Sequence, residues 1–146
     1  MFSAYCPDLL LGQCLTDVAR TPDFIVRWTF SGRTSPYILQ TYCGFRVTHE
    51  GETILTQRML YTRTDFDEPL TDATRRFDRD VVRLTSLLPV KIVSVKCSNT
   101  NDLILCAENH LRIEIFADAP PVCEDWRFGP QDDVRLSAFT DCVHLK

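Results

Sequence analysis

Alternating apolar and polar residues predict strands in the first part of the chain. The clearest alternation falls on residues 24–30, where an aromatic or branched apolar residue occupies every second position. A period of two is typical of a sheet with one buried face. Residues 37–48 are also rich in β-branched and aromatic residues, and Gly44 among them indicates a bulge or a bend. A tight turn is expected at 49–52, followed by a returning strand at 53–56.

The middle of the chain changes to a helical period. Within residues 70–88, apolar residues recur at spacings of three and four, which predicts an amphipathic helix with one apolar stripe. Thr71 offers a capping hydroxyl at its start. Pro89 ends the pattern, because the residue before a proline avoids helical geometry. One long helix is therefore expected at about 70–88, with its arginines on a solvated face.

Strand patterns resume after the helix. The expected strands are 91–97, 103–107, 111–116, 124–128 and 134–139. A short hairpin loop at 108–110 joins two of them. The runs 13–26 and 91–105 can be laid beside each other, so residues 13–18 are expected to form a strand as well.

These patterns predict an α+β fold. Antiparallel sheets of about six to eight strands would pack on one long central helix. Residues 1–146 are expected to form a single domain, since that length fits one compact unit. The similarity between the two parts of the chain has one interpretation: the helix joins two β-meander halves, at about 12–62 and 90–140.

Composition narrows the function classes. The 146 residues are 45% hydrophobic and 25% charged, enough for a packed core, and the net charge is −4. An acidic chain without a basic cluster argues against nucleic acid as a partner. A membrane partner is not expected, because no apolar run approaches the roughly 20 residues that span a bilayer. The N-terminus lacks the basic start of a signal peptide, which predicts a cytoplasmic protein. The seven scattered cysteines form no C-x-x-C pair and are expected to act as small apolar residues.

Signatures of catalysis and of metal binding are absent from the sequence. The five glycines form no phosphate-binding loop, and no short Cys or His spacing suits zinc. His49, His110 and His144 are far apart and fall in expected turns or the tail. No catalytic residue, metal ligand or cofactor is therefore predicted.

Charge is distributed unevenly along the chain. Residues 1–99 carry 12 Lys+Arg and 11 Asp+Glu, whereas residues 100–146 carry 4 and 9. Acidic groups around an aromatic anchor suit docking to a basic protein surface. The candidate partner-binding residues are Asp118, Glu124, Asp125, Trp126, Asp132 and Asp133. The alternative for Trp126 and Phe128 is that both rings belong to the core.

One part of the C-terminal half resembles a known family. It combines a strand at 111–116 that ends in an F-x-D-like turn with an E-x-W motif at 124–126 and Gly-Pro at 129–130. In these features residues 90–135 resemble small bacterial immunity proteins of polymorphic-toxin and contact-dependent growth inhibition loci. The resemblance implies a cytosolic protein that binds and blocks one toxin domain and catalyses nothing.

Three functions follow as hypotheses. The first is an immunity-type protein whose acidic surface covers a toxin domain of nuclease type, because a nuclease needs a basic site to hold phosphate. The second is a small-ligand protein or enzyme with a pocket between curved sheet and helix. Its expected lining residues are Trp28, Tyr37, Tyr42 and Phe45. The third is an oligomeric role through an exposed strand edge.

Overall fold

The computed structural model describes residues 6–21, 25–32, 36–56, 72–100, 102–117 and 126–131, without the side chains of 72–74. These residues form nine strands, one α-helix and two short 3-10 turns. The strands are β1 (Cys14–Arg20), β2 (Val26–Ser31), β3 (Tyr37–Thr41), β4 (Gly44–His49), β5 (Glu52–Thr56), β6 (Val90–Cys97), β7 (Leu103–Ala107), β8 (Leu111–Phe116) and β9 (Trp126–Pro130). The helix is α1 (Asp72–Thr85), and the 3-10 turns are η1 (Pro7–Leu10) and η3 (Glu108–His110).

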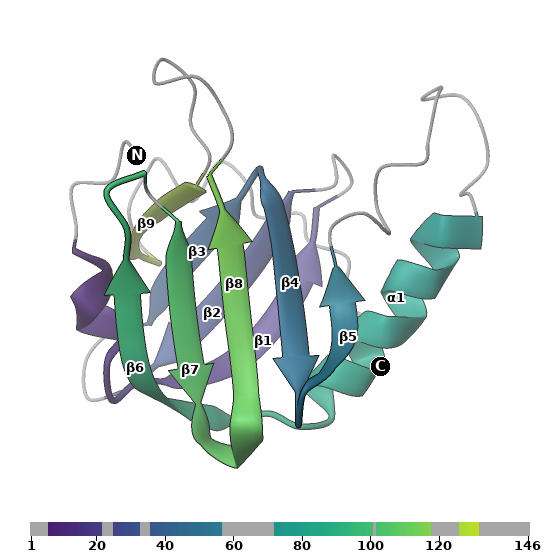
Figure 1. Ribbon diagram of the computed structural model, residues 1–146, viewed down its shortest axis with the longest axis horizontal. Coiled ribbons are helices and arrows are strands. Elements are labelled where there is room, and N and C mark those ends of the chain that lie inside the picture. The colour runs from purple at the N-terminus through teal and green to yellow at the C-terminus, as the bar shows by residue number, and fades with distance from the viewer. Residues whose placement is uncertain are drawn as a thin grey trace.

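The strands form one antiparallel sheet that folds over on itself. Its order is β5-β4-β8-β7-β6-β1-β2-β3-β9. The link between β6 and β1 consists of two residue pairs, Cys14 with Lys91 and Leu15 with Val90. The sheet therefore bends there into two layers, with β6, β7, β8, β4 and β5 in front and β1, β2, β3 and β9 behind (Figure 1). The α+β class is confirmed, but nine strands exceed the six to eight expected.

The core lies between the two layers and continues to the helix. Trp28 of β2 and Phe45 of β4 are buried, and their rings meet edge to face with centroids 5.2 Å apart. Phe77 of α1 lies 6.3 Å from Phe45 in a similar edge contact. The period of two in β2 explains this arrangement, because it turns every second large side chain toward the facing layer.

The helix differs from the prediction in length and in position. It ends at Thr85, where the Leu87 amide donates to the Leu84 carbonyl at 2.9 Å and the last turn tightens to a 3-10 bond. The Thr85 hydroxyl also bonds a carbonyl, that of Val82, at 2.9 Å. Pro89 then prevents continuation. The helix is also not central, since it packs against β5 and β1 at one side of the two layers (Figure 1).

Residues 37–48 form two strands in opposite layers instead of one bent strand. β3 pairs with β2 and β9, whereas β4 pairs with β5 and β8. Gly44 begins the second strand, so the expected bend is a crossing between layers. The turn after β4 is confirmed: Glu50 and Gly51 have φ of 52° and 83°, the geometry of a two-residue hairpin turn that favours glycine.

Each half of the chain contributes a three-stranded meander, β1-β2-β3 or β6-β7-β8. Each meander is followed by a strand that crosses to the other layer, so that β4 joins β8 and β9 joins β3. Outward from the junction of β6 and β1, each layer therefore has the same order: a three-stranded meander and then a strand from the other half. The two halves exchange strands, so that one sheet contains strands of both. The expected strand at 134–139 lies outside the described residues.

Candidate functional site

Trp126 is a core residue, which corrects its assignment to the partner-binding surface. It is 0% exposed and pairs with Thr41 at the start of β9. Phe128 is 1% exposed, and its ring stacks on Tyr37 with centroids 5.3 Å apart. Because successive side chains of a strand alternate between faces, residues 126 and 128 both point toward the core. The alternative interpretation of these two rings is therefore confirmed.

The other five predicted residues, Asp118, Glu124, Asp125, Asp132 and Asp133, lie outside the described residues. The structure does fix the points at which they are attached. Glu124 and Asp125 directly precede Trp126, and Asp132 directly follows Gln131. The Gln131 amide donates to the Pro36 carbonyl at 2.8 Å, which anchors that end. The two attachment points, Trp126 and Gln131, are five residues apart, which at about 3.3 Å per residue is roughly 17 Å.

β9 carries these attachment points at one side of the rear layer, where it is the last strand in the sheet order. The described residues contain 11 Lys+Arg and 10 Asp+Glu, so their formal charge is +1. The remaining residues therefore carry a formal charge of −5, which together with +1 gives the net charge of −4. The described residues are close to neutral as a set, and the acidic excess belongs to the other residues of the chain.

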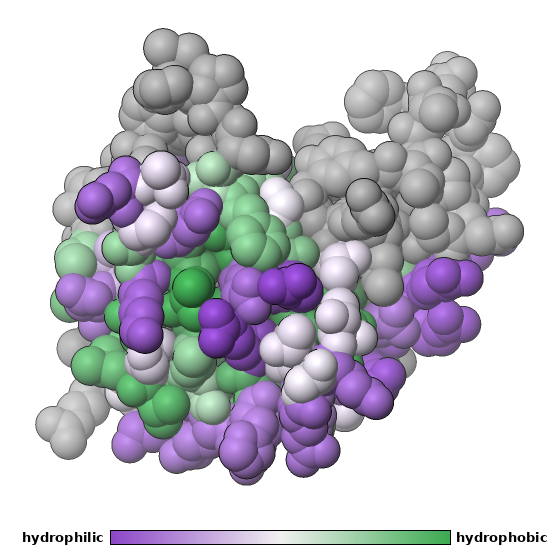
Figure 2. Space-filling model, viewed as in Figure 1, coloured by the Kyte–Doolittle hydropathy of each residue, from purple (hydrophilic) through white to green (hydrophobic). Residues whose placement is uncertain are grey.

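The outer face of the front layer carries a small charged cluster. Glu114 of β8 accepts a bond from Arg46 of β4 at 2.8 Å, and Arg112 lies 3.0 Å from its other oxygen. The carboxylate is largely buried, whereas both arginine side chains are about half exposed. Arg46 also lies over the Phe116 ring, 5.7 Å from its centroid. Two cations share one anion there, and Figure 2 shows this face as polar in the middle with apolar areas beside it.

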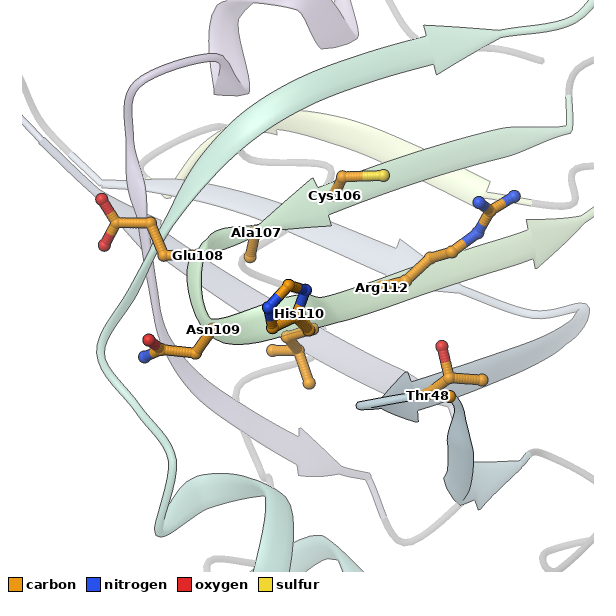
Figure 3. Close-up of a pocket in the computed structure, with 9 residues that line it drawn as sticks. Thr48, Cys106, Ala107, Glu108, Asn109, His110 and Arg112 are labelled. Carbon is orange, nitrogen blue, oxygen red and sulfur yellow. The ribbon is translucent and has the colours of Figure 1, made fainter.

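A hollow of about 540 Å³ lies beside this cluster, where the turns of two hairpins meet. It is lined by Thr48, Gly51, Cys106, Ala107, Glu108, Asn109, His110, Leu111 and Arg112 (Figure 3). The Glu50 amide donates to the His110 carbonyl at 3.1 Å and joins the two turns. Among the described residues, every non-glycine residue with positive φ lies here: Glu50, Asn109 and His110. The lining residues carry a hydroxyl, an amide, an imidazole, a carboxylate and a guanidinium, but the Glu108 and Asn109 side chains point away from Thr48 and Arg112 (Figure 3).

Sequence analysis missed this hollow because it depends on pairing between distant strands. Thr48 of β4 lies opposite Arg112 of β8, which in turn lies opposite Cys106 of β7. No local pattern brings Thr48 to the other two. The signal that was available is the turn chemistry, since Gly51 and Asn109 are residue types that accept positive φ.

The residues expected to line a pocket between sheet and helix have other roles. Trp28 and Phe45 are in ring contact inside the core, and Tyr37 stacks on Phe128. The Tyr42 hydroxyl donates to Gln40 Oε1 at 3.2 Å. The apolar stripe of the helix is buried as well, through Phe77, Val81 and Leu84. The space between helix and sheet is thus occupied by core side chains at these positions.

The described residues contain no group of three His, Cys, Asp or Glu side chains that could hold a metal ion. His49 is the last residue of β4, His110 is exposed in η3, and His144 lies outside the described residues. The described cysteines are free thiols. No helix in this part of the chain is long and apolar enough to cross a membrane.

Comparisons of the chain with protein-family models, with curated proteins and with solved structures find no match.

Proposed function

We propose that this chain is an immunity-type protein that acts in the cytoplasm by binding a cognate toxin domain of nuclease type. The acidic residues that flank β9 would form the binding surface, and the chain itself would catalyse no reaction. One observation carries the proposal: two acidic pairs, Glu124-Asp125 and Asp132-Asp133, are attached at or next to the ends of a strand whose aromatic residues are locked in the core.

The charge distribution gives this arrangement a physical rationale. A nuclease holds its substrate with Lys and Arg, so an acidic surface can occupy the same groups. Opposite potentials also accelerate encounter, an effect that weakens as salt screens the charges. Because β9 is held by backbone pairing with β3 along five residues, its two ends keep a constant separation. A fixed separation lowers the entropy lost when the acidic pairs engage their partner.

Neutralising the acidic pairs is expected to abolish protection against the toxin. The variant is Glu124→Gln/Asp125→Asn/Asp132→Asn/Asp133→Asn, and the measurement is growth of cells that co-express it with the toxin domain encoded by the neighbouring gene. Loss of steering should also slow association by about 10-fold or more at low salt. The side chains keep nearly the same size, so the free energy of unfolding should change little.

A matched control removes four carboxylates elsewhere: Asp8→Asn, Glu50→Gln, Glu52→Gln and Glu108→Gln. All four residues are exposed, and the last three lie in or beside the two hairpin turns. We expect this control to protect cells as the unaltered chain does. Full protection by the variant around β9, with a normal unfolding curve, would refute the proposal.

A further inference from the structure

Two exposed thiols from distant parts of the chain lie at the ends of two elements that pack together, η1 and β6. Cys6 immediately precedes η1, and Cys97 is the last residue of β6. Both are free and exposed. Neither belongs to the surface proposed for the toxin or to the hollow.

Backbone pairing places the N-terminal segment along β6. The Gly12 amide donates to the Ile92 carbonyl at 2.9 Å, and the Ile92 amide donates to the Gln13 carbonyl at 2.8 Å. The pairing between β1 and β6 is antiparallel. Residues 10–13 form a turn, closed by the bond from the Gln13 amide to the Leu10 carbonyl at 3.0 Å, and η1 before this turn packs against β6. Figure 1 shows the purple N-terminal turn, η1, beside the arrowhead of β6.

The chain before Gly12 is long enough to reach the Cys97 end of the strand. From Ile92 to Cys97 the strand advances five residues, or about 17 Å. From Gly12 back to Cys6 the chain includes the four residues of η1, at about 2 Å each, and two extended steps, which together can span roughly 15 Å.

The electrostatic surroundings of Cys97 agree with this placement. Burial raises the pKa of the Cys97 thiol, and Cys6 raises it further, ahead of Asp8 and Asp102. The Cys6 thiol is therefore among the groups that act on Cys97. The Cys97 Sγ itself lies 3.7 Å from the Ser98 carbonyl oxygen, a contact that leaves it at the surface.

We propose that Cys6 and Cys97 form a dithiol pair that closes to an intramolecular disulfide and fastens the N-terminal turn to the end of β6. The oxidant is a small-molecule disulfide such as oxidised glutathione. One cysteine thiolate attacks it and releases one glutathione thiolate. The second cysteine then attacks the protein sulfur of the mixed disulfide and releases the other. Two electrons pass from the protein thiols to the oxidant, and the two protons end on glutathione.

The pair responds to the redox state of the compartment. In a reducing cytoplasm both thiols stay open, and an oxidised glutathione pool closes them. Closure links the start of η1 to the end of β6 and encloses a long loop, which restricts the unfolded chain and raises the unfolding temperature.

The test oxidises the reduced full chain with oxidised glutathione, alkylates the remaining thiols and maps peptides by mass spectrometry. We expect two of the seven thiols to be lost and one linkage, Cys6 to Cys97, within a monomer. Stable glutathione adducts on both residues, or a linkage to any other cysteine, would overturn the proposal.

Three variants complete the test. Cys97→Ser is expected to retain glutathione on Cys6, and Cys6→Ser to retain it on Cys97, because each lacks the second attacking thiol. If one of these two variants fails to fold, the other still tests whether a single cysteine retains glutathione. Cys106→Ser, a change at a half-buried cysteine of β7, should form the Cys6–Cys97 linkage normally. Loss of the linkage in this control would also count against the pair.

Discussion

Replacing Asp78 by alanine is expected to lower the free energy of unfolding by about 3 kcal/mol. Asp78 lies on α1 and accepts bonds from Arg20 Nε at 2.6 Å and Arg20 Nη2 at 2.9 Å. The side chains are 7% and 15% exposed, so solvent screens the pair little. Removing one partner of a buried pair leaves the other charge without the group that compensates it. Urea unfolding followed by the fluorescence of the buried Trp28 and Trp126 measures the change.

Two controls separate this ion pair from a general effect of charge. Asp80→Ala removes the partner of Arg79, a side chain that is 72% exposed and 3.8 Å away, and should cost less than about 1 kcal/mol. The double change Arg20→Met/Asp78→Leu should restore much of the stability, because apolar residues fit a buried site. Equal losses for Asp78→Ala and Asp80→Ala would show that the pair does not hold the helix to β1.

Replacing Trp126 by alanine is expected to cost about 3–5 kcal/mol, since it removes a fully buried ring. The same change should weaken toxin binding, because β9 would no longer hold its two ends in place. Trp126→Phe keeps most of the buried volume and should preserve both stability and binding. Chemical unfolding and titration with the toxin domain measure the two effects.

The matched control for Trp126 is Phe116→Ala. Phe116 is 38% exposed at the end of β8, and its loss should cost about 1 kcal/mol or less. If Trp126→Phe leaves stability intact but abolishes binding, Trp126 contacts the partner, and its role as an internal support for β9 is wrong.

The local elements were predictable from the sequence, but their arrangement was not. Alternation predicted β2, and the hairpin between β7 and β8 follows from polar residues between two apolar runs. The crossing at Gly44 was not evident, because β3 and β4 have similar composition. β4 pairs with β8, which lies far along the chain. The bonded residues Arg46 and Glu114 on these two strands are 68 positions apart in the sequence. Such pairing depends on packing between the layers, which no local period encodes.

Of the six candidate site residues, Trp126 alone lies within the described residues, and it is buried. Uneven charge along the chain predicted an acidic surface around β9. The pattern Trp126-Arg127-Phe128 already contained the argument against Trp126 as a surface anchor, since it alternates as a half-buried strand does. The hollow was not predicted, because pairing between distant strands brings its residues together.

Amide hydrogen exchange of the full chain, alone and bound to the toxin domain, measures the proposed interface most directly. We expect binding to slow exchange in residues 118–125 and 131–133, on both sides of β9. Slower exchange confined to residues 48–51 and 106–112 would place the partner at the hollow and contradict an acidic interface around β9.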